Sequence, residues 1–120
     1  MPEERFKPII TSAKTAEHYT WGGACDGWHL VRNGSLSVIE ESMPPGSQEF
    51  RHHHERAHQF FYVIDGEAEM EAEGETVRIS ARQGIQIPPG VRHQIRNQSN
   101  ATVRFLVISQ PPSHGDRVND

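Results

Sequence analysis

The sequence predicts an all-β protein built as an antiparallel barrel or sandwich, and three observations support this fold class. Many short apolar or alternating segments are separated by turn residues at regular spacing, which is typical of all-β domains. No segment shows a long apolar period of 3.6 residues, so no substantial helix is expected. In residues 67–73, four glutamates alternate with Ala68, Met70 and Ala72. This pattern predicts a strand with a charged solvent face and an apolar core face.

The N-terminal third carries the weakest strand signals. We expect residues 1–8 to form a loose charged arm, residues 9–10 to begin a strand, and residues 11–20 to form a loop or a weak helix. Two tryptophans and three glycines follow within the eight residues 21–28.

The rest of the chain is predicted to form strands separated by turns. Asp65-Gly66 is the strongest hairpin signal, and Pro88-Pro89-Gly90 predicts a tight turn because proline fixes φ and glycine accepts positive φ. Residues 113–120 follow two prolines and are expected to form a tail. All 120 residues are expected to form one domain. The expected strands cover residues 36–41, 59–64, 67–73, 76–80, 85–87, 91–96 and 103–108.

Four histidines lie within seven residues, directly before the longest unbroken apolar run of the chain. Imidazole is the commonest protein ligand for Zn, Fe, Cu and Ni. His52 and His54 are two residues apart and therefore share one face of a strand, whereas His53 points to the other face. The chain then turns and enters the next strand. This brings a further donor, Gln59 or His58, within reach of the same point.

The histidine tract and a downstream segment together resemble the cupin superfamily, in its small single-domain form. The first cupin motif is Gly, five residues, His-x-His, three or four residues, Glu, six residues and Gly. Residues 46–66 match it at Gly46, His52, His54 and Gly66, and Gln59 stands where the family has Glu.

The second cupin motif is Gly, five residues, Pro-x-Gly, two residues, His, three residues and Asn. Residues 82–97 match it at Pro88, Gly90, His93 and Asn97. The opening glycine falls on Arg82, with Gly84 nearby, so this turn is expected to be built differently. The resemblance covers residues 46–97 and implies an antiparallel double-stranded β-helix, or jelly-roll barrel.

The expected metal ligands are His52, His54 and His93, with the amide oxygen of Gln59 as the fourth. None of these groups is negative, so the charge of a divalent ion is left uncompensated. This favours Zn, Ni, Cu or Fe(II) over Mn or Mg, and it favours an anionic ligand. His58 is the alternative to Gln59, or orients a neighbouring ligand. The competing interpretation is a barrel that keeps its histidines and binds no metal.

Aromatic and polar side chains near the histidines are expected to line a pocket. Gln48 and Phe50 share the parity of His52 and His54, and Phe61 shares that of Gln59. Trp21 and Trp28 can fill the mouth of a barrel or stack on a ligand, although core packing is the plainer alternative. The expected pocket residues are Trp21, Trp28, Gln48, Phe50 and Phe61.

The resemblance implies two classes of function. The first is a small metalloenzyme of the dioxygenase, isomerase or cyclase type, in which the metal polarises a carbonyl or binds an enolate of an aromatic or enolisable substrate. Some cupins with Gln at this ligand position are zinc-dependent polyketide cyclases and others are oxygenases. The second class is a non-catalytic module that binds a sugar or another small molecule, with the metal holding the ligand or the fold.

Composition limits the partners and the location. A net charge of −4 argues against nucleic acid or an anionic membrane as the main partner. Cys25 is the single cysteine, so no internal disulfide is expected. The first ten residues lack the apolar core of a signal peptide, and no run has transmembrane length, so a soluble cytoplasmic protein is expected. Small single-domain cupins are often homodimers, and residues 6–10 offer an apolar segment for pairing with a partner's sheet edge.

Overall fold

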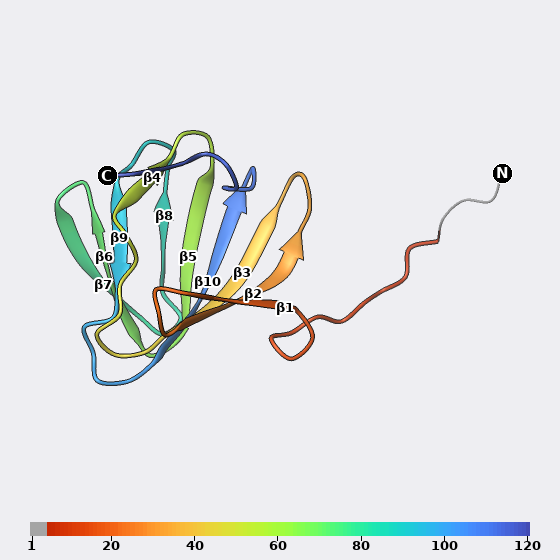
Figure 1. The fold of residues 1–120 in the computed structure, drawn as a ribbon, viewed down its shortest axis with the longest axis horizontal. Helices are drawn as coiled ribbons and strands as arrows, with labels where there is room; N and C mark the ends of the chain where they lie inside the picture. Colours follow the sequence, from red (N-terminus) through yellow and green to blue (C-terminus); the bar gives the residue numbers. More distant parts are fainter. Residues whose placement is uncertain (1–4) are drawn as a thin grey trace.

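The computed structural model describes residues 5–120 as two antiparallel β-sheets that face each other (Figure 1). The larger sheet has the strand order β1-β2-β3-β10-β5-β8, and the smaller has the order β11-β4-β9-β6-β7. Residues 5–120 contain no helix. The strands are β1 (Glu17–Trp21), β2 (Cys25–Arg32), β3 (Ser37–Met43), β4 (His52–His54), β5 (His58–Asp65), β6 (Glu67–Ala72), β7 (Glu75–Ser80), β8 (Gly84–Ile87), β9 (His93–Arg96), β10 (Val103–Gln110) and β11 (Arg117–Asn119).

From β3 onward the chain passes repeatedly between the two sheets. β3, β5, β8 and β10 lie in the larger sheet, whereas β4, β6, β7, β9 and β11 lie in the smaller one. The late strand β10 is inserted between β3 and β5, and β9 is inserted between β4 and β6. This winding is the double-stranded β-helix that the two sequence motifs implied, so the predicted fold class is confirmed.

The core lies between the sheets and follows from the period of two residues along each strand. In β10, Val103, Phe105, Val107 and Ser109 are buried, while the residues between them are only partly buried. Three hydrophobic side chains of β5 and β6 (Val63, Ala68 and Met70) are at most 1% exposed. The inward face predicted for residues 67–73 is therefore confirmed.

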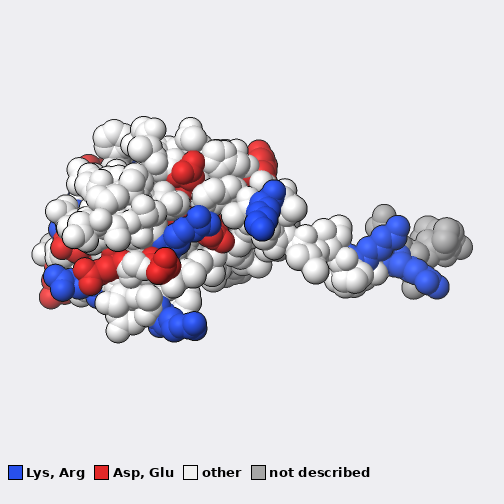
Figure 2. Space-filling model, turned by 90° about the horizontal axis from the view of Figure 1, so that it is seen from below, with Lys and Arg blue, Asp and Glu red and all other residues white. Residues whose placement is uncertain are grey.

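The outer face of the smaller sheet carries ion pairs. The glutamates of β6 each pair with an arginine of another segment, at Glu67–Arg78, Glu69–Arg96 and Glu71–Arg51. Figure 2 shows acidic and basic side chains intermingled on one face of the molecule. The predicted charged outer face is therefore confirmed, and its charges are largely neutralised locally.

Three expectations at the chain ends were wrong. Strand β1 occupies residues that were expected to form a loop or helix, because its polar sequence carries no clear alternation and its pairing with β2 decides its conformation. Strand β11 occupies part of the expected tail and pairs with β4. Ile9 and Ile10 are exposed and form no strand, and residues 1–4 of the expected arm lie outside the described residues. In the described chain, no helix has the length and hydrophobicity to cross a membrane.

Asn97 ties the turn after β9 to the end of β3. Its Nδ2 donates to the carbonyl oxygens of Met43 at 2.9 Å and Ala101 at 2.8 Å. Its Oδ1 accepts from the backbone N–H and the hydroxyl of Ser99. The side chain is fully buried, so the motif asparagine is a structural brace between the two sheets.

The Asn97→Ala substitution is predicted to lower the free energy of unfolding by about 2–4 kcal/mol, because buried carbonyl groups lose their donors. Urea denaturation measures the change. Asn100→Ala is the matched control, since Asn100 lies exposed in the same turn and should change stability by less than about 0.5 kcal/mol. Equal losses for the two variants would contradict the bracing role of Asn97.

Candidate metal centre

Three buried histidines meet between β4 and β9. His52 and His54 lie on one face of β4, and His52 is directly opposite His93 in the antiparallel register. One donor atom from each of the three residues lies within 4.8 Å of the other two. The residues are 3%, 6% and 0% exposed, respectively. His53 points to the opposite face of β4, where its Nδ1 lies 2.9 Å from Asp120 Oδ2.

Each of the three imidazoles is oriented through its Nδ1 atom. The Nδ1 of His52 lies 2.8 Å from the Phe50 carbonyl, and that of His93 lies 2.9 Å from the Val91 carbonyl. The Nδ1 of His54 lies 2.8 Å from Asp116 Oδ1. Because these oxygens accept hydrogen bonds, they place the proton on Nδ1 and leave the Nε2 lone pairs free. This is the arrangement of histidines that ligate metals in proteins.

The environment keeps the imidazoles neutral. Burial above all, together with the neighbouring His93, Arg117 and His54, lowers the pKa of His52 to about 3, against the opposing effect of the Phe50 carbonyl. Burial is also the main cause that lowers the pKa values of His54 and His93. Near pH 7 all three rings are therefore unprotonated on one nitrogen and able to act as ligands.

Gln59 supplies a fourth polar atom to the same region. Its Nε2 donates to Ser109 Oγ at 3.0 Å, which fixes the orientation of the amide. Its Oε1 is buried without a hydrogen-bond partner, and so is Nε2 of His93. Buried polar atoms without partners are rare in folded proteins. Three neutral imidazoles and an unpartnered amide oxygen fit a divalent ion with nitrogen and oxygen ligands.

The neighbouring residue, His58, is placed differently. It is exposed, whereas Gln59 is buried, because alternate residues of β5 point to opposite faces of the sheet. The structure thus brings His52, His54 and His93 together, with Gln59 lining the adjoining cavity, and leaves His58 on the outside.

Asp116 was not found by sequence reasoning. It lies in the segment expected to be a tail, and it is 5% exposed. Besides orienting His54, it accepts hydrogen bonds through Oδ2 from the N–H groups of Arg56 at 3.0 Å and Ala57 at 2.9 Å. Burial raises its pKa, but these donors and the His54 ring outweigh that effect and hold the pKa below its usual value. Nothing in the polar run around Asp116 signals this role in the sequence.

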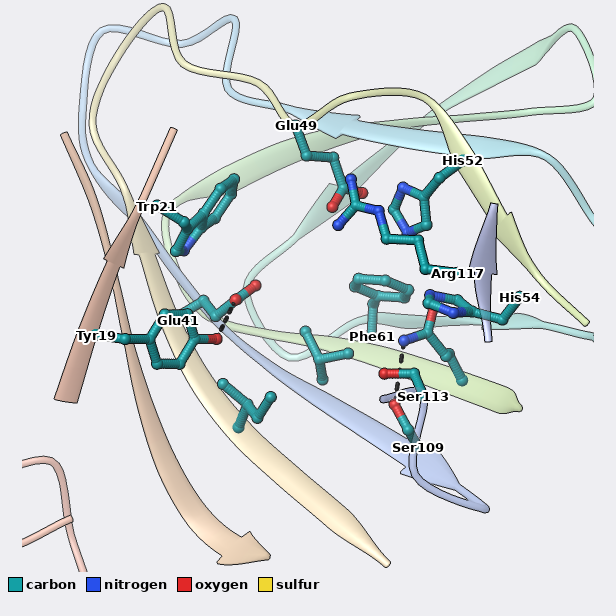
Figure 3. A pocket seen from close by; sticks show the side chains of 13 residues that line it. Tyr19, Trp21, Glu41, Glu49, His52, His54, Phe61, Ser109, Ser113 and Arg117 are labelled. Atoms are coloured by element: carbon teal, nitrogen blue, oxygen red, sulfur yellow. Dashed lines mark hydrogen bonds between the residues drawn. The ribbon is translucent and has the colours of Figure 1, made fainter. Parts of the chain in front are cut away.

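A cavity of about 220 Å³ adjoins the histidines (Figure 3). Trp21 and Phe61, two of the expected pocket residues, are among the residues that line it. Arg117 of β11 extends into the space between Glu49 and His52 in this view. The cavity is lined by Tyr19, Trp21, Ile39, Glu41, Glu49, His52, His54, Gln59, Phe61, Val107, Ser109, Ser113 and Arg117.

The other expected pocket residues lie elsewhere. Gln48 and Phe50 line a neighbouring groove that shares Trp21 with the cavity. Trp28 does not line the cavity, because it alternates with the buried Cys25 and Gly27 along β2 and so lies on the opposite face. Its ring packs instead against the guanidinium of Arg104, with 4.7 Å between Arg104 Cζ and the ring centroid.

The fold and the histidine cluster define a small β-barrel protein with a candidate metal centre, and comparison with known proteins places it in a family. A family model described as "Cupin domain" matches residues 39–109. The chain therefore belongs to the cupin family, as its two motifs indicated.

Known relatives fall into more than one functional group. Polyketide synthase CurC of Streptomyces cyaneus is 35% identical over 69 residues, which cover 58% of this chain and 45% of that protein. An oxalate-binding protein of Thermotoga maritima is 32% identical over 78 residues, which cover 65% of this chain and 64% of that protein. The chain spans less than two thirds of either relative. The solved structure of KdgF from Halomonas sp. shares the fold with a TM-score of 0.80, at 18% identity, over 90% of this chain and 97% of that one.

The Asp116→Asn substitution is predicted to destabilise the metal-free protein by about 2–3 kcal/mol. An amide has one acceptor oxygen, so its NH2 group must face either the His54 N–H or the two backbone N–H groups. Urea denaturation after treatment with a chelator measures the loss. Asp120→Asn is the matched control. Among the described residues, the Asp120 carboxylate has a polar contact with the His53 ring alone, and it is more exposed than that of Asp116. A loss no larger than that of the control would contradict the role assigned to Asp116.

Proposed function

We propose that this cupin is a small metalloenzyme in which His52, His54, His93 and Gln59 hold a divalent transition metal. The strongest support is the pair of unpartnered buried atoms, Gln59 Oε1 and His93 Nε2, at a cluster of neutral imidazoles. Zn, Ni, Fe(II) and Cu suit this donor set better than Mn, which prefers carboxylate ligands. When bound, the metal supplies Lewis acidity that polarises a carbonyl oxygen.

The chain's own residues set the substrate class. Trp21, Phe61 and Val107 present apolar walls beside the histidines, and an aromatic or enolisable small molecule suits them. A cavity of about 150 Å³ is enough for benzene, so 220 Å³ accommodates roughly one ring with substituents. Dioxygenase, isomerase and cyclase reactions all fit such a substrate. The match to a polyketide synthase protein, CurC, agrees with this class.

A second candidate is a non-catalytic module that binds a small molecule through the metal. It is favoured by the match to an oxalate-binding protein. Metal removal separates the two candidates: an enzyme loses turnover and keeps its fold, whereas a binding module loses only ligand affinity or stability.

The proposed ligand set predicts about one metal ion per chain. His52→Ala and His93→Ala are each expected to abolish tight binding, because only two imidazoles remain near the amide. His53→Ala is the matched control on the same strand and should bind as wild type does, since its ring points away. Elemental analysis of untagged protein measures the metal content. Loss of metal in the His53 variant would contradict the assignment of His53 to the other face of β4.

Alanine substitutions of Gln59 and of the neighbouring His58 test which side chain is the fourth ligand. Gln59→Ala is expected to weaken metal binding, whereas the exposed His58 is expected to tolerate substitution by alanine. If His58→Ala removed the metal and Gln59→Ala left it bound, His58 would be the fourth ligand instead.

We also propose a homodimer located in the cytoplasm. Phe6, Ile9 and Ile10 are 88%, 85% and 92% exposed, and a partner subunit would cover this apolar segment. The free, buried thiol of Cys25 is compatible with a reducing compartment. Light scattering at micromolar concentration should give twice the chain mass of 13.6 kDa. A mass equal to that of one chain would contradict the dimer.

A further inference from the structure

Two carboxyl groups line the same cavity as His52 and His54, as Figure 3 shows. Glu41 lies on β3, and Glu49 lies in the connection between β3 and β4. Neither forms an ion pair within residues 5–120. Six other glutamates do pair with arginines: Glu17, Glu40, Glu67, Glu69, Glu71 and Glu73. Glu41 and Glu49 therefore do not belong to the glutamate–arginine ion pairs of the surface. Their position in the cavity indicates another role.

Tyr19 holds Glu41 in a defined position. The Tyr19 hydroxyl donates to Glu41 Oε2 at 2.7 Å, as the dashed line in Figure 3 shows. The Tyr19 ring reaches across β2 over Gly27, where a Cβ atom would overlap it. Burial strongly raises the pKa of Tyr19, so the hydroxyl stays protonated and remains a donor. One oxygen of Glu41 is thereby fixed, and the other is left to the cavity.

Glu49 is held less firmly. Its Oε1 accepts the N–H of Ile95 at 3.2 Å. Burial above all, together with the charge of Glu41, raises the pKa of Glu49 to about 8. Burial raises the pKa of Glu41 to about 7, against the opposing effects of Tyr19 and Arg117. Near neutral pH the pair therefore holds about one proton, which leaves one carboxylate as a base and one carboxylic acid as a donor.

The same cavity contains an independent sign of a ligand. Gln59 is 7% exposed, lines the cavity, and has no partner for its Oε1 atom. Apolar side chains, among them Phe61 and Val107, line the cavity together with these polar groups. A carbonyl compound bound in this cavity would lie against the apolar walls and meet both the histidines and the two carboxyl groups.

We propose that Glu41 and Glu49 form the acid–base pair of this cavity and shift a proton within a bound carbonyl compound of about one ring in size. This inference rests on the proposed metalloenzyme function. The carboxylate removes a proton from the carbon next to the carbonyl. The electrons of that C–H bond form a C=C bond, and the π electrons of the carbonyl move to its oxygen. The carboxylic acid gives its proton to that oxygen, so the net change is keto–enol tautomerisation without oxidant or reductant.

The test uses the Zn²⁺-loaded protein and racemic 2-hydroxycyclohexanone as a one-ring enolisable probe. Proton NMR in D2O follows the exchange of the C2 proton, and zinc content and probe binding are measured on the same samples. Wild-type protein should accelerate exchange, and Glu41→Gln and Glu49→Gln should each reduce the acceleration roughly 100-fold or more while zinc stays bound. Glu40→Gln is the matched control, because Glu40 is adjacent on β3 but pairs with Arg104 and does not line the cavity.

A second measurement distinguishes proton transfer from a structural effect. The exchange rate of wild type should rise as the first carboxyl group ionises near pH 7 and fall as the second ionises near pH 8, which gives a bell-shaped profile. Tyr19→Phe should move this profile to higher pH, because Glu41 loses the donor that stabilises its charged form.

The outcomes separate the two proposals. Bound zinc and bound probe without accelerated exchange, or exchange in both Gln variants as fast as in wild type, would overturn the acid–base pair and leave the metal centre in place. Failure of wild type to bind zinc would overturn the proposed metalloenzyme, and the acid–base pair with it.

Discussion

The register between β4 and β9 is the constraint on which the site depends. His52 stands opposite His93, and the period of two residues along β4 adds His54 to the same face. A slip of one residue would turn His52 and His54 outward and bring His53 in. β4 is only three residues long, so hydrogen bonds from outside the strand must hold this register. Gly90 N–H donates to the His54 carbonyl at 2.7 Å, and Asp120 N–H donates to the Arg51 carbonyl at 2.8 Å.

The C-terminal segment contributes more than an edge strand. β11 pairs with β4 along its whole length, from Arg117 opposite His54 to Asn119 opposite His52. Asp116 orients His54, and Arg117 reaches the cavity, where its charge lowers the pKa values of Glu41 and Glu49. The cavity thus combines neutral nitrogen and oxygen donors with carboxyl groups that ionise near neutral pH. This combination suits a ligand whose carbonyl group is polarised and which exchanges a proton.

The sequence predicted the parts of the site that depend on local periodicity. The spacing of His52 and His54 and the parity of Gln59 follow from strand geometry, and the matched motifs supplied His93. Tyr19, Glu41, Glu49 and Asp116 were missed. Each acts through a contact between segments far apart in sequence, such as the 62-residue separation of Asp116 from His54. Polar strands such as β1 and β11 carry no apolar alternation, so their pairing could not be predicted from the sequence either. Trp28 was expected in the pocket because the strand parity of β2 was not resolved from sequence.

The central claim is that three imidazoles and one amide oxygen hold a metal between the two sheets. X-ray absorption spectroscopy of the zinc-loaded, untagged protein tests it most directly, because the spectrum counts imidazole ligands and distinguishes nitrogen or oxygen from sulfur. The account predicts three imidazole nitrogens and at least one oxygen at roughly 2.0–2.2 Å from zinc. A spectrum with fewer than three imidazoles, or with a sulfur ligand near 2.3 Å, would contradict it.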